Sequence, residues 1–333
     1  PPRPALAPPP APNSDAAGHA VDAPYSTGPR SPLALEARGL GRVFRVGLRR
    51  RRVVALDGVD LRVARGAHVG LVGPNGSGKS TLLRLAAGVD RPTSGDVRVF
   101  GDGPLRRPAR ERLAYLPDAL ALPPELRAGE ALGITARLRS DGLHRPGEEA
   151  AGAPVRGRRA LRRAVDGMLE RVGLEDARTT PLGGFSRGMG RRFGLAQAFF
   201  GAPDLVLLDE PTAGLDAPGF PVLADLLAEA RARGATIVVA SHVATGVVER
   251  CDEVVLLARG RLVRTGAPEE LLADPARASL ELVAGSEGAA ATAEGARATL
   301  ERDGFTVERA GPSLRSLAEL YAGADRPRTD GGA

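Results

Sequence analysis

The sequence has few of the residue types that build disulfide scaffolds, metal clusters and membrane spans. Its 333 residues include one cysteine, Cys251, and no tryptophan. A single cysteine excludes an internal disulfide or a cysteine-based metal cluster, and this fits a reducing compartment. No apolar run approaches the roughly eighteen residues that cross a bilayer, and the first residues lack the pattern of a secretory signal. We therefore expect a cytoplasmic chain that does not itself span a membrane.

Lysine is almost absent as well. Of the 46 cationic side chains only Lys79 is a lysine, so we expect that position to need a compact ammonium rather than a planar guanidinium. The net charge is +6, although residues 269–333 carry 12 acidic and only 7 basic side chains. The basic excess on the rest of the chain is compatible with a polyanion partner, but a solvated basic face is the favoured interpretation.

The two ends of the chain differ from its middle. Residues 1–32 contain ten prolines and seven alanines without apolar periodicity, which predicts a disordered tail. Residues 33–270 carry short apolar segments and helical patterns, so we expect one large domain there. Residues 271–333 are predicted to form a small α+β appendage, with a helix followed by a strand.

Within the large domain, strand and helix patterns alternate. The segments LVLLDEP (205–211) and ATIVVASH (235–242) are continuous apolar runs, typical of strands buried on both faces of a parallel sheet. Helical spacing between them predicts an α/β fold. Residues from about 120 to 200 are predicted to form a helical insertion with a mobile loop near 140–160, and residues 251–266 a hairpin that turns at Arg259–Gly260.

A phosphate-binding loop follows a predicted strand and opens a predicted helix. Residues 73–80 match G-x-x-x-x-G-K-[ST], in which backbone N–H groups cradle phosphates. Lys79 is expected to reach the β- and γ-phosphate oxygens of a nucleotide, and Ser80 to offer a hydroxyl to Mg²⁺. The predicted nucleotide-binding residues are Gly73, Pro74, Asn75, Gly76, Ser77, Gly78, Lys79, Ser80 and Thr81.

Two carboxylates follow the apolar run at 205–208. Asp209 and Glu210 precede Pro211, so we expect them at the carboxyl edge of the sheet, where ligands bind in open α/β folds. Asp209 is predicted to hold Mg²⁺ and Glu210 to act as the general base toward an attacking water.

These elements resemble the ATP-binding subunit of ATP-binding-cassette (ABC) transporters over residues 33–270. Residues 185–192, Phe-Ser-Arg-Gly-Met-Gly-Arg-Arg, resemble the helix-starting signature of that family in its drug- and ABC-2-type exporter version. Ser186, Gly188 and Met189 would then contact ATP in trans, with Arg187 and Met189 standing where the usual second glycine and glutamine are found. Asp216 resembles the D-loop aspartate at the same interface.

The resemblance also implies roles for three further residues. His242 matches the switch histidine that would hydrogen-bond the γ-phosphate. Asp118 stands in place of the Q-loop glutamine and is a further candidate Mg²⁺ ligand. Phe44 matches the ring that stacks on adenine. Because Arg49–Arg52 separate Phe44 from the predicted strand at 53–56, a core phenylalanine is an equal alternative.

The resemblance implies a P-loop NTPase core with an antiparallel β subdomain and a helical signature subdomain. One chain carries one set of motifs, so two cassettes would dimerise head to tail around ATP and Mg²⁺. They would power export through a separately encoded membrane permease at the inner face of the cell membrane, without direct contact to nucleic acid. The alternative is a soluble ABC-type ATPase that acts on nucleic acid or ribosomes.

Overall fold

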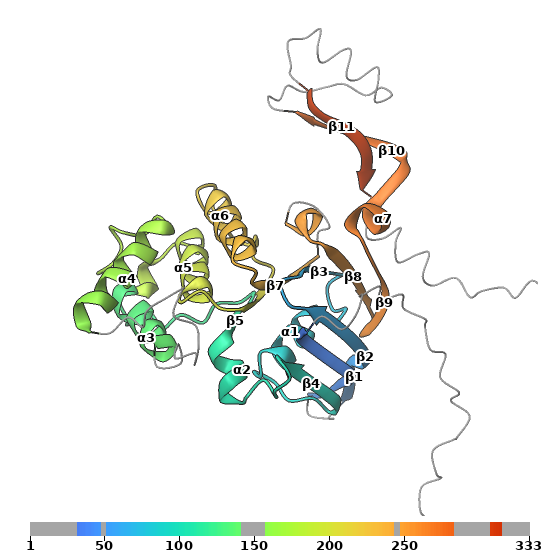
Figure 1. The fold of residues 1–333 in the computed structure, drawn as a ribbon, viewed down its shortest axis with the longest axis horizontal. Helices are drawn as coiled ribbons and strands as arrows, with labels where there is room; N and C mark the ends of the chain where they lie inside the picture. The colour runs from blue at the N-terminus through green and yellow to red at the C-terminus, as the bar shows by residue number, and fades with distance from the viewer. Residues whose placement is uncertain (1–31, 48–50, 141–156, 243–246, 283–306, 315–333) are drawn as a thin grey trace, which may run out of the picture.

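The computed structural model describes five stretches of the chain, coloured in Figure 1: residues 32–47, 51–140, 157–242, 247–282 and 307–314. The tail expected at 1–32 lies outside them except for Pro32. Most of the loop expected near 140–160 and the helix expected in the appendage also lie outside the described residues. These three expectations stay predictions.

A six-stranded sheet runs through the centre of the molecule (Figure 1). In spatial order its strands are β5 (Leu113–Leu116), β6 (Leu205–Asp209), β7 (Thr236–Ser241), β3 (His68–Val72), β8 (Glu253–Ala258) and β9 (Arg261–Gly266). The first five are parallel, and β9 returns antiparallel after the predicted turn at Arg259–Gly260. Every residue of β3, β6 and β7 is buried, and for β6 and β7 this is what their continuous apolar runs predict.

Alternate residues of the central strands face two different cores, because successive side chains of a strand point to opposite faces. Leu205 and Leu207 of β6 belong to one core, and Val206 and Leu208 to the other. The first core includes residues of α1, and the second includes residues of α5 and α6. The bounds of these helices are α1 (Lys79–Ala86), α5 (Arg187–Phe199) and α6 (Gly219–Ala232).

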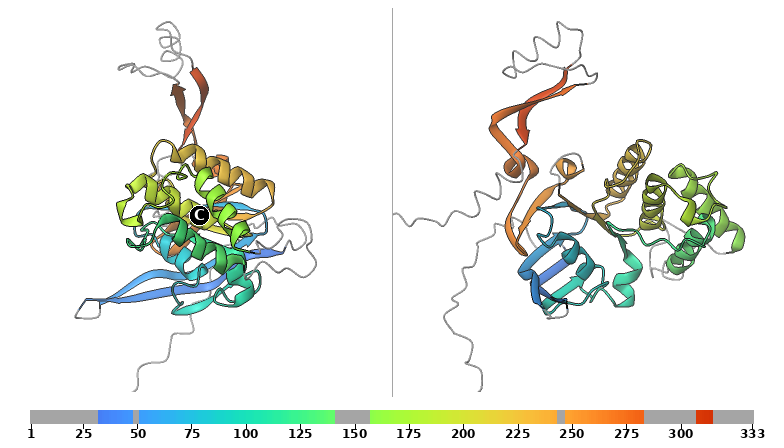
Figure 2. Two further views of the ribbon diagram at one scale, coloured as in Figure 1. Left: turned by 90° about the vertical axis from the view of Figure 1, so that its left-hand side faces the viewer. Right: turned by 180° about the vertical axis from the view of Figure 1, so that it is seen from behind.

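A second sheet of three antiparallel strands lies beside α1 and shares its core. Its spatial order is β2 (Arg51–Ala64), β1 (Leu33–Val46) and β4 (Ser94–Val99). In β2, Val59, Leu61 and Val63 are buried and alternate with exposed residues, as expected for a sheet with one face on the core. The β1–β2 pair projects from the molecule in the left view of Figure 2. This sheet matches the antiparallel subdomain that the resemblance implies.

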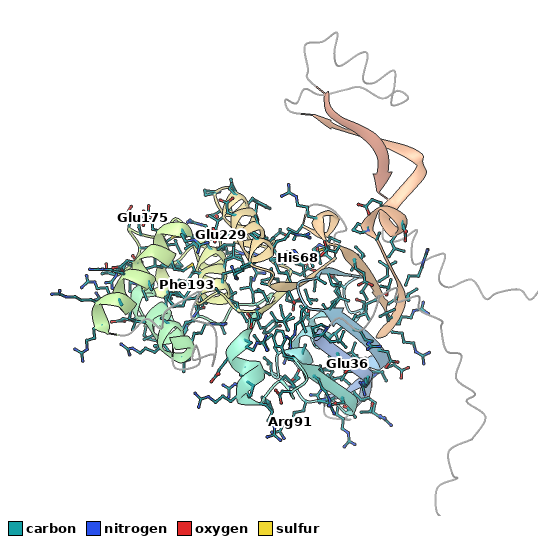
Figure 3. All side chains as sticks on the ribbon, viewed as in Figure 1. Glu36, His68, Arg91, Glu175, Phe193 and Glu229 are labelled. Atoms are coloured by element: carbon teal, nitrogen blue, oxygen red, sulfur yellow. The ribbon has the colours of Figure 1, made fainter. Side chains whose placement is uncertain are left out.

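The predicted helical insertion is present and forms its own core. Besides α5 it contains α3 (Ala128–Ser140), α4 (Arg158–Arg171) and the short 3₁₀ turn η1 (Leu182–Gly184). Phe193 of α5, labelled in Figure 3, is fully buried there. Its ring meets that of Phe185 edge to face at a centroid distance of 6.0 Å. Because Leu195 and Phe199 of α5 pack toward the main sheet, this helix joins the two parts.

Short elements connect the sheets and extend the chain beyond β9. They are α2 (Arg107–Arg112), η2 (Val248–Arg250), α7 (Pro268–Leu272), β10 (Ala273–Leu282) and β11 (Val307–Leu314). The strand expected in the appendage is present as β11. Strand β10 was not predicted; it pairs antiparallel with β11. Within the described residues, none of the helices combines the length and the apolar character that a membrane span requires.

A buried histidine begins the central strand β3. His68 is 6% exposed, its backbone N–H donates to Asp252 at 2.8 Å, and its Nε2 has no hydrogen-bond partner in the described part of the chain. Burial lowers the pKa of His68, and the positive charge of Arg231 lowers it further, against opposing contributions from Asp252 and the Ala235 backbone. The folded state therefore favours the neutral form of the His68 ring.

We expect His68→Gln to lose less of its free energy of unfolding than the wild type as the pH falls from 8 to 5. Because the folded pKa lies below the unfolded value of 6.5, the unfolded state binds the extra proton first, and stability falls as the pH drops below about 6.5. The loss approaches about 1.4 kcal/mol per pH unit in that window. Urea unfolding of both proteins from pH 8 to pH 5 measures it. Parallel profiles would show that His68 does not titrate on unfolding.

Candidate active site

The predicted phosphate-binding loop lies between β3 and α1 and depends on two left-handed glycines. Gly76 has φ +80° and Gly78 has φ +110°. A Cβ on Gly78 would lie 2.6 Å from the carbonyl oxygen of Ala55 and 2.7 Å from Leu56 Cδ2, so strand β2 packs directly against the loop. Only glycine satisfies both the backbone angle and this close approach.

The β8–β9 turn holds the loop from another side. Gly260 N–H donates to the carbonyl oxygen of Ser77, and Asp57 N–H donates to that of Gly260, both at 2.9 Å. Arg261 forms an ion pair with Asp57 at 2.6 Å. The sequence pattern predicts the turn but does not indicate this contact, since Ser77 and Gly260 are 183 positions apart. The loop is thus held by β2 and by the turn.

Lys79 and Ser77 present polar groups inside the loop. Lys79 is 6% exposed, and its Nζ donates to the carbonyl oxygens of Gly73 at 2.6 Å and Pro74 at 3.2 Å. Burial lowers the pKa of Lys79, while the charges of Glu210 and Asp209 oppose that shift. The buried Ser77 hydroxyl has no hydrogen-bond partner within the described residues. A cradle with a buried ammonium and an unpaired hydroxyl fits the phosphates of a nucleotide.

Ser80 and Asp209 meet although 129 positions separate them. Ser80 Oγ donates to Asp209 Oδ1 at 3.0 Å, and Asp209 is 2% exposed. Burial raises the pKa of Asp209, the bond from Ser80 lowers it, and the charges of Asp118 and Glu210 raise it. These two oxygens fit Mg²⁺, a hard cation that also takes oxygens from phosphates.

Asp118 follows β5, the strand that pairs with β6. It is close enough for its charge to raise the pKa of Asp209, but the described residues hold no ready-made cluster of three or more metal-ligating side chains. A cation at Ser80 and Asp209 would therefore need further oxygens from its nucleotide. The assignment of Asp118 as a Mg²⁺ ligand stays a prediction.

Glu210 and His242 meet where β6 and β7 end. Asp209 pairs with Ala240 across the sheet, and His242 Nδ1 lies 2.9 Å from Glu210 Oε2. The Glu210 side chain is 12% exposed and that of His242 is 50% exposed, so the pair opens to solvent on the histidine side. Glu210 has φ +47°, a left-handed backbone that costs a non-glycine residue about 1–3 kcal/mol and is typical of functional sites.

The signature residues gather at the N-terminus of α5. Ser186 caps the helix by accepting the N–H of Met189 at 3.2 Å. A Cβ on Gly188 would lie 2.4 Å from Asp216 Cγ, so the predicted D-loop aspartate packs directly on this glycine. Arg192 holds Asp216 in place, with Nε 3.1 Å from Oδ1.

The two groups of predicted residues belong to different parts of the fold. Helix α1, which begins at Lys79, contributes to the core on one face of the sheet, whereas α5, which begins after Ser186, contributes to the core on the other face and to that of the helical insertion. The structure therefore joins Ser186, Gly188, Met189 and Asp216 as one set. The phosphate loop, Ser80, Asp209, Glu210 and His242 form another.

Phe44 lies on β1 opposite Val53 of β2. Arg51 and Arg52 belong to β2 itself and pair with Val46 and Arg45 of β1, so they do not separate Phe44 from that strand. The ring is half-buried, does not belong to the hydrophobic cores of the described residues, and has the Arg42 guanidinium 4.5 Å from its centroid. This placement favours a stacking ring over a core phenylalanine. Adenine contact stays a prediction.

Sequence reasoning assigned no role to two residues that contact this site. Arg191 is 3% exposed, and its guanidinium donates to the main-chain carbonyl oxygens of Asp118 and Glu210. The Tyr115 side chain hydrogen-bonds Asp209, and burial raises the pKa of its hydroxyl above the usual range. Because arginine is the common cation of this chain, nothing in the sequence distinguishes Arg191. Tyr115 lies within an apolar strand, so the sequence around it does not indicate a polar role.

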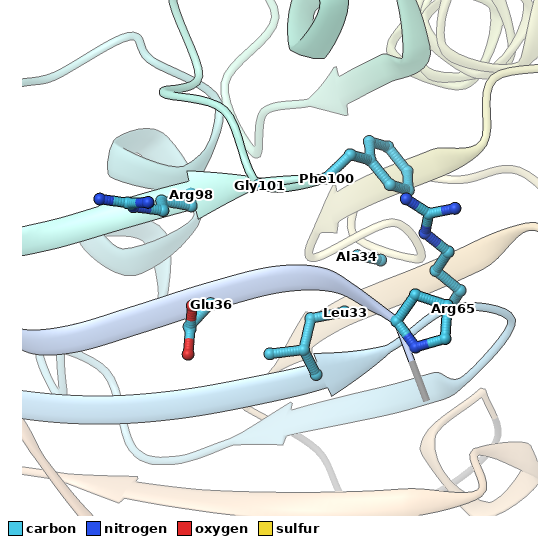
Figure 4. Close-up of a pocket in the computed structure, with 8 residues that line it drawn as sticks. Leu33, Ala34, Glu36, Arg65, Arg98, Phe100 and Gly101 are labelled. Atoms are coloured by element: carbon cyan, nitrogen blue, oxygen red, sulfur yellow. The ribbon is translucent and has the colours of Figure 1, made fainter. Parts of the chain in front are cut away.

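Two further hollows lie away from these residues. One, of about 290 Å³, is lined by Leu33, Glu36, Arg65, Arg98 and Phe100 of the antiparallel sheet and its edges (Figure 4). The other, also about 290 Å³, lies against α3 and is lined by Arg127, Gly129, Glu130, Gly133, Arg137, Arg178 and Thr179. Neither contains a predicted site residue.

Comparisons with known proteins agree with this geometry. Residues 56–213 match the domain family described as ABC transporter. An uncharacterized ABC transporter ATP-binding protein of Nostoc is 34% identical over 245 residues, 73% of this chain and 69% of the relative. The daunorubicin resistance ATP-binding protein DrrA3 of Streptomyces coeruleorubidus is 34% identical over 241 residues, 71% and 72% of the two chains. A solved ATP-binding subunit of an ABC transporter has a TM-score of 0.62 at 25% identity, over 88% of this chain and 100% of the other.

The contact between Gly188 and Asp216 predicts a specific defect for Gly188→Ala. We expect ATP hydrolysis to fall at least tenfold while nucleotide affinity stays within twofold, because a Cβ would displace Asp216 without touching the phosphate loop. Steady-state kinetics and titration with a fluorescent ATP analogue measure the two effects.

Gly190→Ala is the matched control on the same helix. Its Cβ would meet Leu122 Cδ1 at 3.8 Å, an ordinary contact. Alanine favours a helix over glycine at both positions, so helix propensity cannot account for a loss confined to Gly188. If the two variants hydrolyse ATP equally fast, the contact with Asp216 has no part in the reaction.

Proposed function

The chain belongs to the ABC transporter family as an ATP-binding subunit and is an ABC-type ATPase, and we propose that two such cassettes sandwich MgATP to drive export through a separate permease. The observation that carries this proposal is the division of the site residues into two sets on different parts of the fold. Each set is half of a site, and a head-to-tail partner would complete both.

The phosphate-loop half supplies binding and proton transfer. The Lys79 ammonium would exchange the carbonyl oxygens of Gly73 and Pro74 for phosphate oxygens. Ser80 and Asp209 would hold Mg²⁺, which neutralises phosphate charge when bound. Glu210 Oε2 would take the proton of the attacking water, and His242 Nδ1, 2.9 Å away, would orient that carboxylate.

The signature half supplies the response to ATP. Ser186, Gly188 and Met189 at the start of α5 would meet the γ-phosphate held by the partner's loop, with the helix N-terminus favouring its negative charge. Since ADP lacks that phosphate, ATP favours the closed dimer and hydrolysis releases it.

Export and the permease are supported by the relatives and the signature. One relative carries daunorubicin resistance in its name, and Ser186–Met189 resemble the ABC-2 exporter signature. The permease would place the chain at the inner face of the cell membrane. The alternative, an ATPase that acts on nucleic acid or ribosomes, has no comparable support, because the reported relatives are transporter ATP-binding proteins.

Co-purification tests the transporter assignment. Tagged chain recovered from detergent-solubilised membranes of its own source is expected to bring a multi-span permease, identified by mass spectrometry. Lys79→Ala tests whether recovery depends on the nucleotide state. Recovery of ribosomes or DNA-bound proteins without a permease would favour the alternative function.

We expect Glu210→Gln to reduce turnover to a small residual rate and leave ATP bound. The amide keeps the shape of the carboxylate but cannot accept the water proton, so kcat should fall at least a hundredfold, within the range of a lost general base. Hydrolysis and retained nucleotide measure the two effects. The control is Glu229→Gln, an exposed carboxylate paired with Arg171, and it should match the wild type. A Glu210→Gln protein that hydrolyses at the wild-type rate would refute the general-base assignment.

A further inference from the structure

The Arg191 side chain donates hydrogen bonds to main-chain carbonyl oxygens at the ends of two neighbouring strands, β5 and β6. Nη1 donates to Pro117 at 2.7 Å and Asp118 at 3.0 Å, which follow β5. Nη2 donates to Asp209 at 2.7 Å and to Glu210, and Nε donates to Pro211 at 3.2 Å. All three nitrogens of this buried guanidinium are thus occupied by carbonyl oxygens at the ends of β5 and β6.

The two bonds from Nη2 constrain the backbone of Glu210 on both sides. The carbonyl of Asp209 belongs to the peptide group before the Glu210 Cα, and the carbonyl of Glu210 to the peptide group after it. The orientations of these peptide groups define φ and ψ of Glu210. One nitrogen therefore holds the residue in its left-handed conformation at φ +47°.

Both the charge and the planar shape of the Arg191 guanidinium suit this position. Burial lowers the pKa of Arg191, while the charges of Asp118, Asp209 and Glu210 raise it. The cation is thus surrounded by carbonyl dipoles and by the three carboxylates that the site brings together. A lysine would keep the charge, but its single nitrogen has three donors and no planar fork to span both loops.

We infer that Arg191 is a positioning residue for ATP hydrolysis: it holds the strained backbone of Glu210 and ties it to the Asp118 loop. It acts through Glu210 and does not itself contact the nucleotide. Because Arg191 lies on α5, five residues after Ser186, the helix that begins with the signature also supports the general base of its own chain. The inference rests on the proposed role of Glu210.

The test is Arg191→Lys in the full-length chain. We expect kcat to fall at least tenfold while KM for ATP stays within twofold, because the phosphate loop is held by other contacts. Arg139→Lys is the matched control. Arg139 is partly buried and donates to the carbonyl oxygen of Leu113 at the opposite end of β5, so its loss should reduce stability without changing kcat.

A double-mutant cycle with Glu210→Gln separates positioning from general loosening. If Arg191 acts through Glu210, Arg191→Lys should lower the residual hydrolysis of the Glu210→Gln protein by less than twofold. If the Glu210→Gln single variant hydrolyses ATP at the wild-type rate, the proposed role of Glu210 is wrong, whatever the effect of Arg191→Lys.

Three results would overturn the inference: kcat of Arg191→Lys within twofold of wild type, an equal loss in Arg139→Lys, or a full tenfold loss that persists in the Glu210→Gln background. Where Arg191→Lys does not fold, Arg191→Gln is compared in the same cycle, since its amide keeps two donors for the carbonyls around Glu210. Thermal unfolding of each variant establishes that the proteins compared are folded at the assay temperature.

Discussion

The parallel pairing of β3, β6 and β7 is the constraint on which the site depends. Their backbone hydrogen bonds set Val72 beside Ser241 and Asp209 beside Ala240, so all three strands end at one edge. The residues that follow them are the phosphate loop, Glu210 and His242, which lie far apart in the chain. A register shift in any one strand would move its functional residue away from the others.

That edge gathers charges that repel one another, and the fold compensates with buried cations and hydrogen bonds. Asp118, Asp209 and Glu210 converge there. Lys79, Arg191 and the Ser80 hydroxyl counter them, each held by main-chain or side-chain contacts. The result is a polar interior that would be unfavourable without these partners. The same compensation allows the left-handed backbone at Glu210 to persist.

Much of the fold could be predicted because its signals are local. Continuous apolar runs mark β6 and β7, the helical spacing between them marks α6, and the phosphate loop has a pattern with a mechanical reason for each residue. Strand β10 was missed, since its sequence, ADPARASLEL, contains an internal proline and lacks strict alternation. The functional residues could likewise be predicted from the sequence, because binding phosphate and Mg²⁺ requires a few specific donor groups in a set order.

Local residue patterns are thus enough to predict which residues can carry phosphate binding and hydrolysis and which segments become strands. The contacts that support those residues become visible in the folded protein: Gly260 bonds to the phosphate loop, Asp216 packs on Gly188, and Arg191 spans two loops. These contacts join positions up to 183 residues apart. They depend on close packing between surfaces whose shapes exist only after the chain has folded, so no local pattern encodes them.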